Sequence, residues 1–277
     1  MPITEMTYEA LDARVRVFRA GSEVDCFAIV SDSHVIILDT FTTPEDALEM
    51  IQILKPSFES RILLVINSHQ HSDHTWGNAV FAQDGAFQAP ILAHKRSKDL
   101  LEKQRAQLLE YQVNQPRLMN ARIIPPTVYF SDSCTINAGD LTLELMPAFG
   151  HTSDQIVVWI PELQTLLATD ALEFPFPYVA SSGNLAQMRA TMLKLRALKP
   201  RVVLPCHGGL HDASLIVKNL EYFDWLEASI LVDGDTSFEA ALKRQSLARD
   251  AVDEMYLEFH DLNIAATKKF LNDQSSG

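Results

Sequence analysis

The chain has 277 residues, of which 23 are basic and 36 acidic, so its formal net charge is −13. Such a length allows one large domain or two small ones with a buried core, which excludes a wholly disordered chain. The excess of negative charge argues against nucleic acid as a partner, because affinity for nucleic acid comes largely from Lys and Arg.

Three features of the sequence predict a cytoplasmic protein. Cys26, Cys134 and Cys206 form neither an even-numbered disulfide framework nor a CxxC pair, so we expect reduced thiols. No apolar run approaches the roughly 18 residues that a membrane helix requires, so no membrane partner is expected. Residues 1–17 carry acidic side chains where a signal peptide would need a basic start and an apolar stretch.

The first third of the chain is expected to form strands with one helix between them. Alternation of apolar and basic residues at 15–17 predicts a half-exposed strand, and residues 26–30 and 35–38 predict two more buried ones. Thr43 is an N-cap candidate directly before a proline and two acids, which predicts a helix over residues 44–55. The continuous apolar run at 61–66 is typical of a strand covered on both faces.

The rest of the chain mixes strands and helices and becomes mainly helical from about residue 211. Residues 95–115 have leucines at helical spacing and predict one helix that lies over a cleft. Further strands are expected at 127–130, 141–146, 156–160, 165–168 and 202–204, and further helices at 185–198 and from 214 onward. Because no linker or repeat divides the chain, we predict a single domain over residues 1–277, with two packed sheets and helices outside them.

The most informative motif lies at residues 67–74, directly after the strand expected at 61–66. It places three imidazoles and a carboxylate within six residues, and these nitrogen and oxygen ligands suit zinc. His69 and His71 can share one side of an extended backbone, whereas Asp73 and His74 lie past a bend and can face a second ion. Since five of the nine histidines fall at this motif or at the related sites below, chance clustering is a poor explanation.

This motif and three later ones resemble the metallo-β-lactamase-fold hydrolases, from the strand before Asp39 to the helix after His207. The family has four motifs in a fixed order, and each has a counterpart here. The HxHxDH signature corresponds to His69, His71, Asp73 and His74, and the GHT motif corresponds to Gly150-His151-Thr152. The bridging aspartate corresponds to Asp170, and the final PxHG corresponds to Pro205-Cys206-His207-Gly208. A single motif of this kind would mean little. The ordered set, with each member at the end of an expected strand, is strongly specific.

The resemblance implies both the fold and the chemistry. The fold would be α/β, an αββα sandwich of two packed mixed β-sheets with helices on the outer faces. The implied cofactors are two Zn²⁺ ions, with iron or manganese as alternatives. The first would be bound by His69, His71 and His151, the second by Asp73, His74 and His207, with Asp170 bridging them. The implied reaction is attack of a metal-bridging hydroxide on the acyl carbonyl of an ester, lactone or thioester, with Asp73 and Asp170 as catalytic residues.

Other candidate residues are expected near these ligands. Asp39 resembles an aspartate that the family places behind the ligands, where it would fix a histidine tautomer; the alternative is an Asp that caps a turn. Trp76, Phe174, Phe176 and Tyr178 follow ligand segments and either line an apolar pocket or pack in the core. Two prolines keep the segment 174–178 out of a central strand, so its aromatic rings are expected in a loop near Asp170.

Residues near Asp170 help to separate branches of the family. The segment 150–172 resembles class B1 β-lactamases, but these have cysteine at the position of Asp170, arginine at that of His74, and lysine at that of Glu173. A carboxylate at position 173 would repel the carboxylate of a β-lactam, so only weak β-lactamase activity is expected. Asp170 resembles instead the glyoxalase II and lactonase branches. Many lactonases carry tyrosine at position 173, for which Tyr178 is a candidate substitute.

Three functional alternatives stay open beside a zinc hydrolase of small acyl substrates. They are a β-lactamase, a non-hydrolytic enzyme with one iron such as a persulfide dioxygenase, and a metal-free binding module. The complete ligand set favours two metals. The related tRNA-processing nucleases fit poorly with the acidic charge. The sequence does not decide between a monomer and a homo-oligomer.

Overall fold

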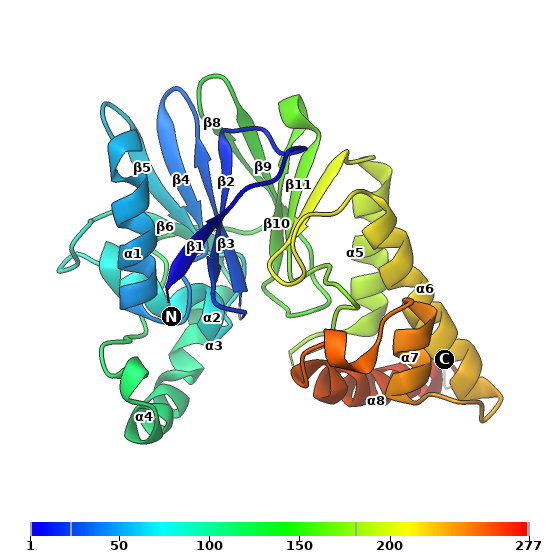
Figure 1. Cartoon of the computed structure of the whole chain (residues 1–277). Helices are drawn as coiled ribbons and strands as arrows, with labels where there is room; N and C mark the ends of the chain where they lie inside the picture. Colours follow the sequence, from blue (N-terminus) through cyan, green and yellow to red (C-terminus); the bar gives the residue numbers. More distant parts are fainter. Residues whose placement is uncertain (1, 23, 181, 276–277) are drawn as a thin grey trace. The chain divides into compact units, whose positions relative to one another are not determined.

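The structure is a computed structural model that describes residues 2–22, 24–180 and 182–275 (Figure 1). The chain divides into two compact units. Unit 1 comprises Met1–Pro147 and Ile156–Thr165, and unit 2 comprises Ala148–Gln155 and Leu166–Gly277. The expected single domain over residues 1–277 stays a prediction.

A seven-stranded mixed sheet forms the centre of unit 1. Its strand order follows the sequence: β1 (Ile3–Met6), β2 (Val15–Ala20), β3 (Val24–Val30), β4 (His34–Leu38), β5 (Ile62–Ile66), β6 (Ile91–His94) and β7 (Val128–Phe130). Strands β1 to β4 pair antiparallel, and β4 to β7 pair parallel. The parallel strands β4, β5 and β6 therefore end at the same edge, so the loop after β4 lies beside the loop after β5.

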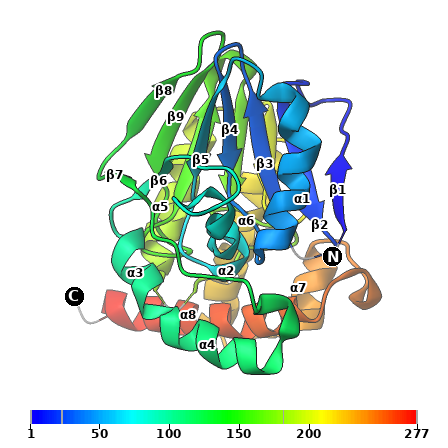
Figure 2. The ribbon, with the colours of Figure 1, turned by 90° about the vertical axis from the view of Figure 1, so that its left-hand side faces the viewer.

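Helix α1 (Pro44–Leu54) connects β4 to β5 and lies on one face of this sheet (Figure 2). The Thr43 side chain accepts a hydrogen bond from the Asp46 N–H at 3.1 Å, as expected of an N-cap. The helix ends at Leu54 and gives way to the 3-10 turn η1 (Lys55–Ser57), which contains Pro56. The helix predicted for residues 44–55 is confirmed.

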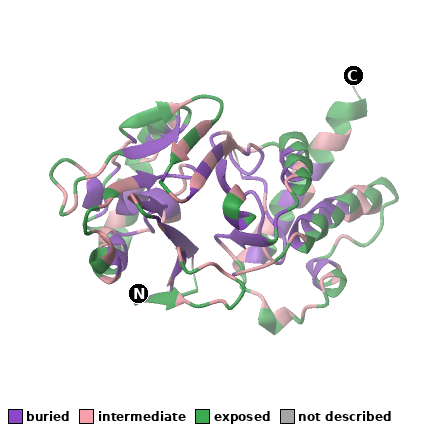
Figure 3. Cartoon of the chain, turned by 90° about the horizontal axis from the view of Figure 1, so that it is seen from above, coloured by how far each residue is buried: buried purple, intermediate pink, exposed green. Residues whose placement is uncertain are grey.

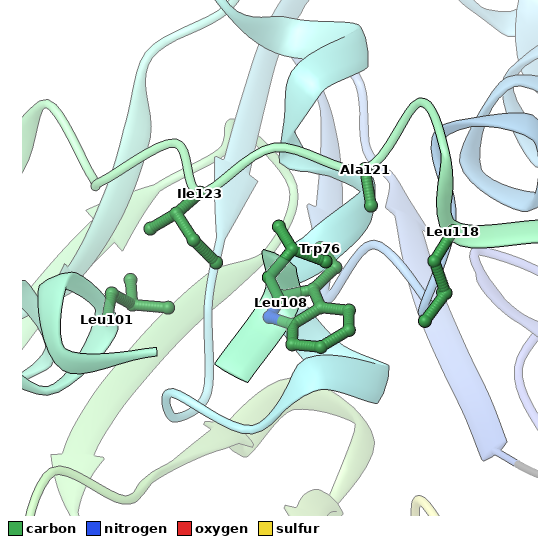
Figure 4. Packing of buried hydrophobic residues seen from close by; sticks show 6 residues of the cluster. All are labelled: Trp76, Leu101, Leu108, Leu118, Ala121 and Ile123. Atoms are coloured by element: carbon green, nitrogen blue, oxygen red, sulfur yellow. The ribbon is translucent and has the colours of Figure 1, made fainter. Parts of the chain in front are cut away.

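The single helix expected over residues 95–115 is wrong. The structure has two helices there, α3 (Ser97–Lys103) and α4 (Arg105–Asn114), which meet at Gln104. The Gln104 side chain fixes this break, because its amide donates to the Gln70 carbonyl at 2.7 Å and accepts from the Trp76 indole N–H at 2.9 Å. Both helices cover the buried cluster formed by Trp76, Leu101, Leu108, Leu118, Ala121 and Ile123 (Figure 4).

The second sheet is built from β8 (Cys134–Asn137), β9 (Thr142–Pro147), β10 (Ile156–Ile160), β11 (Thr165–Thr169) and β12 (Val202–Pro205). In unit 1, β8, β9 and β10 pair antiparallel in that order. All residues of β10 and β11 are buried, which explains their continuous apolar sequences. With two mixed sheets and helices, the chain has the α/β fold class that the sequence predicts.

The helices of unit 2 are α5 (Leu185–Ala197), α6 (Ser214–Leu231), α7 (Phe238–Arg244) and α8 (Met255–Ser275). Helices α5, α6 and α8 contact one another. In each of these helices the buried residues lie along one side and the exposed residues along the opposite side (Figure 3). The remaining short elements are the helix α2 (Ser72–Thr75) and the 3-10 turns η2 (Trp76–Phe81), η3 (Pro116–Leu118), η4 (Pro161–Leu163) and η5 (Arg249–Ala251).

Candidate metal centre

The first group of candidate ligands lies in unit 1, at the carboxyl end of β5. His69 and His71 precede helix α2, whereas Asp73 and His74 lie in it, so the expected bend falls between the two pairs. The imidazole of His69 lies 4.6 Å from that of His71 and 4.1 Å from that of His74, measured between ring centroids. His74 Nε2 lies 3.3 Å from Asp73 Oδ2. The loop thus brings four potential ligands together.

The Asp39 carboxylate holds this loop in its orientation by accepting hydrogen bonds from Ser68 and His74. It follows β4 with a left-handed φ of 69°, and its carboxylate is fully buried. One oxygen accepts from the Ser68 N–H at 2.7 Å, and the other accepts from the Ser68 hydroxyl at 2.7 Å and from His74 Nδ1 at 2.8 Å. Burial raises the pKa of Asp39, while His74 and the hydrogen bonds oppose that rise.

These hydrogen bonds define the tautomers of two histidines. His74 donates its Nδ1–H to Asp39, which puts the imidazole lone pair on Nε2. His69 Nδ1 lies 2.9 Å from the Ser68 hydroxyl, whose own hydrogen is donated to Asp39. The hydroxyl therefore accepts from His69, and the lone pair of His69 is also on Nε2.

A buried amide pair supports the same loop, and the sequence motifs did not indicate it. The side chains of Asn67 and Asn78 exchange hydrogen bonds at 3.1 and 2.9 Å, and the Thr40 hydroxyl donates to Asn78 Oδ1 at 2.9 Å. Gly77 is required beside them, since a Cβ atom there would lie 1.8 Å from the Thr40 carbonyl oxygen. A Trp-Gly-Asn triplet at residues 76–78, one residue after the ligand motif, is the sequence signal for this support.

The second group of candidate ligands lies in unit 2. Asp170 follows β11 and His207 follows β12, and Asp170 Oδ2 lies 3.6 Å from Nε2 of both His151 and His207. His151 donates its Nδ1–H to the Tyr178 carbonyl at 2.9 Å, which again puts the lone pair on Nε2. Asp170 therefore lies between two imidazoles, as a carboxylate that bridges two ions would require.

Two glycines allow the close packing of these ligand loops. Gly150 has a φ of 143°, and a Cβ there would lie 2.2 Å from the Cα of Met188 in α5. Gly208 has a φ of 110°, and a Cβ there would lie 2.6 Å from the Cβ of Phe174. Side chains other than glycine would be strained at both positions, which accounts for the glycines of the GHT and PxHG motifs.

The aromatic residues that follow the ligands have different roles from one another. Trp76 and Phe176 pack in the core, which was the alternative to lining an apolar pocket. Trp76 belongs to the buried cluster of unit 1. Phe176 stacks on Tyr222 with ring centroids 4.4 Å apart. Half-buried Phe174 lies beside His211 at 5.1 Å. The ring of Tyr178 stacks on Phe259, and its backbone carbonyl accepts the hydrogen bond from His151.

Glu173, the carboxylate expected to repel an anionic substrate, is buried within unit 2. Its side chain is 1% exposed, and Oε2 accepts a hydrogen bond from the Tyr256 hydroxyl at 3.4 Å. Asn219 holds its backbone through bonds of 3.1 and 2.8 Å. Burial, with the nearby charges of Glu173 and Asp170, raises the pKa of Tyr256 well above its ordinary value, so the phenol stays protonated. Neither Tyr256 nor Asn219 lies in a recognisable motif.

The structure also bears on the cysteines and on membrane-spanning helices. Cys26, Cys134 and Cys206 are not joined by disulfide bonds. Among the described residues, none of the helices combines the length and the apolar character that a bilayer-crossing helix needs.

Comparison with known proteins gives concordant results. The family model of the metallo-beta-lactamase superfamily matches residues 20–207. Two curated relatives named metallo-beta-lactamase type 2, from Bacillus sp. (strain 170) and Bacillus cereus, are each 24% identical over 196 residues, which is 68% of this chain and 67% and 68% of the relatives.

Solved structures resemble the chain in fold. A metallo-beta-lactamase from Pontibacter korlensis has a TM-score of 0.62 and 18% identity, with 79% of this chain and 97% of that chain covered. The metallo-beta-lactamase FIM-1 from Pseudomonas aeruginosa, in its mono-zinc form, has a TM-score of 0.60 and 16% identity, with 80% and 94% covered. At these identities the likeness concerns the fold alone.

Proposed function

Because this chain belongs to the metallo-beta-lactamase superfamily, we propose that it is a zinc-dependent hydrolase that opens an acyl bond in a small ester, lactone or thioester. We further propose that the ligands of the two units bind two ions in common. His69, His71 and His151 would hold the first ion, Asp73, His74 and His207 the second, and Asp170 would bridge them.

One observation carries this proposal: His69, His74 and His151 all have the same tautomer. Each has its Nδ1 engaged by a hydrogen-bond acceptor, namely the Ser68 hydroxyl, the Asp39 carboxylate and the Tyr178 carbonyl. Metal-ligating histidines in proteins are held in this way, with the second ring nitrogen directed at the ion. The same arrangement at three histidines of one candidate centre, two of them oriented through Asp39, favours metal ligation over a merely polar loop.

The chemistry of the donor set fits divalent ions. Imidazole nitrogens and carboxylate oxygens are common zinc ligands, and iron and manganese are alternatives that the same donors accept. When bound, two such ions would polarise an acyl oxygen and supply an activated water near neutral pH. Asp73 and Asp170 would offset two of four positive charges, which leaves the centre cationic enough to attract an acyl oxygen. The Asp73 side chain is 28% exposed, so it is also within reach of an attacking water.

A β-lactamase is the second candidate, because curated relatives named metallo-beta-lactamase are 24% identical to the chain. Against it stands Asp170, in the place where the class B1 enzymes have cysteine. An enzyme with a single iron is a further alternative. A small-molecule substrate, rather than nucleic acid, agrees with the net charge of −13. The cytoplasmic location stays a prediction.

A hydrolysis screen tests the proposal. Zinc-loaded protein would be assayed against lactones, thioesters, neutral esters, β-lactams and phosphodiesters, with chelator-treated protein and Asp73→Ala as controls. We expect turnover of at least one neutral acyl class, lost in both controls. Turnover of β-lactams alone would favour the second candidate, and activity that survives the chelator would contradict a metal-dependent reaction.

A further inference from the structure

A short backbone segment of unit 2, residues 177–180, determines where His151 points. The Tyr178 carbonyl accepts the hydrogen bond from His151 Nδ1 at 2.9 Å, and the Ala180 N–H donates to the backbone carbonyl of His151 at 3.1 Å. The ring of Tyr178 also lies against the imidazole, with centroids 4.8 Å apart. Any shift of this segment would therefore move both the backbone and the ring of a candidate ligand.

The side chain of Asn263, in the C-terminal helix α8, clamps this segment on both sides of Tyr178. Its Oδ1 accepts from the Val179 N–H at 3.0 Å, and its Nδ2 donates to the Pro177 carbonyl at 2.8 Å. These bonds fix the peptide units on either side, so they also fix the direction of the Tyr178 carbonyl. Asn263 is completely buried, so its amide is shielded from competing water.

A second set of hydrogen bonds adjoins Asn263 within unit 2. Asn263 Nδ2 also lies 3.2 Å from the Tyr222 hydroxyl, which lies 2.8 Å from His260 Nδ1. His260 Nε2 donates to the Thr236 carbonyl at 2.8 Å, so its Nδ1 accepts from Tyr222. Four residues before Asn263 in α8, Phe259 stacks on the ring of Tyr178, with ring centroids 4.0 Å apart. Helix α8 thus contacts Tyr178 through its ring and through the peptide bonds on both sides.

We propose that Asn263 is a positioning residue for His151, so that the helical region beyond the family match adjusts metal affinity. The family model ends at residue 207, whereas Asn263 lies 56 residues later, so this support belongs to a part of the chain that the model does not cover. The inference rests on the proposed function only in taking His151 as a zinc ligand. It needs no particular substrate.

The test is a double-substitution cycle read out as zinc affinity. Zinc dissociation constants would be measured by chelator competition for the wild type, Asn263→Ala, His151→Ala and the double variant. Loss of a group that orients a ligand typically weakens metal binding by about 10- to 100-fold. We expect that loss for Asn263→Ala in the wild-type background, and a change of less than about twofold in the His151→Ala background. Equal losses in both backgrounds would overturn the proposal.

Tyr222→Phe is the matched control for general destabilisation. It removes one hydroxyl from the same network but keeps both bonds between Asn263 and the segment. We expect a lower unfolding midpoint with zinc affinity unchanged. If Tyr222→Phe weakens zinc binding as much as Asn263→Ala does, loss of stability alone explains the effect and the positioning role is wrong.

A measurement on the unsubstituted protein keeps the proposal testable if Asn263→Ala does not fold. Because coupling between two sites is reciprocal, zinc binding should slow amide hydrogen exchange in α8 around Asn263, but much less in α7. Unchanged exchange in α8 would overturn the proposal. Zinc binding with this coupling, but without hydrolysis of any test substrate, would refute the proposed function alone. A wild type that binds no zinc would refute both.

Discussion

At the scale of single residues, Asp39 connects two candidate ligands to the end of a strand. One of its oxygens accepts from both the Ser68 hydroxyl and His74 Nδ1, and Ser68 in turn accepts from His69. A buried group with this many polar partners is costly to alter, because each lost bond leaves a desolvated donor. The tautomers of His69 and His74 therefore depend on one carboxylate.

We predict that Asp39→Asn weakens zinc binding by about 10- to 100-fold, the range found when the partner of a ligating histidine is altered. The amide can accept on one side only, and its NH₂ group would face a donor on the other. Chelator competition measures the loss. Asp84→Asn is the control, since Asp84 forms an exposed ion pair with Arg122 in the same unit and should leave zinc affinity unchanged. Equal affinities for Asp39→Asn and the wild type would contradict the assigned role.

Glu173 was expected to repel an anionic substrate, and the structure adds that its side chain is buried. That expectation implies that Glu173→Lys would improve the hydrolysis of anionic substrates. Burial and the contact with Tyr256 add a cost in stability, because an ammonium group there would be removed from water and would replace the acceptor of the Tyr256 hydroxyl.

We now predict that Glu173→Lys destabilises the fold by about 3 kcal/mol or more, the range for an uncompensated buried charge. Glu173→Gln, which keeps an acceptor for the Tyr256 hydroxyl, should cost much less. Urea unfolding of the two variants beside the wild type measures both costs. Similar stabilities for Lys and Gln, together with faster turnover of an anionic substrate by the Lys variant, would restore the original expectation.

At the scale of secondary structure, local signals decided which predictions succeeded. The N-cap at Thr43 and the proline after Leu54 confine α1, and the fully apolar run of β10 has the bounds that were expected, Ile156–Ile160. Strands β1, β6 and β8, of four residues each, were missed, although β7 and β12 are as short and were predicted, so length alone does not explain the difference. The break between α3 and α4 depends on contacts of Gln104 with distant residues, which no local pattern reveals.

The contact of α8 with α6 contains a histidine whose charge state should couple to stability. Burial lowers the pKa of His260 below its ordinary value of 6.5, although its hydrogen bond to the Thr236 carbonyl opposes this. As pH falls below about 6.5, the unfolded chain gains a proton at this residue before the folded chain does. The free energy of unfolding should therefore fall over that range, by at most about 1.4 kcal/mol per pH unit for one group.

The variant His260→Gln isolates this contribution, because its amide can accept from Tyr222 and donate to the Thr236 carbonyl without titrating. His94 and His211 also have pKa values lowered by burial, so the wild type alone would give their combined effect. Urea unfolding from about pH 7.5 to 5.5 should show the wild type losing stability relative to the variant. Parallel curves would mean that His260 takes up its proton equally in both states.

At the scale of the whole molecule, the sequence indicates the candidate ligands but not most of the groups that orient them. Metal-binding motifs consist of specific side chains, so the seven candidate ligands can be read directly. The Tyr178 carbonyl is a backbone group that every residue possesses, and Asn263 lies in a helix without a motif. Their roles arise only when the chain has folded.

The division into two units could not be read from composition either. The chain passes between the units after Pro147, after Gln155 and after Thr165, and none of these points has the Gly, Ser or Pro content of a linker. A rule that looks for linkers therefore counts one domain. The candidate ligands come from both units, four from unit 1 and three from unit 2.

The most direct test of the central claim is the number and identity of the metal ions bound per chain. Protein equilibrated with zinc and freed of loosely bound metal would be analysed by elemental mass spectrometry, alongside His151→Ala from unit 2 and His74→Ala from unit 1. We predict about two zinc ions per wild-type chain and fewer in each variant. One tightly bound iron with no second site, or no metal that depends on these histidines, would contradict it.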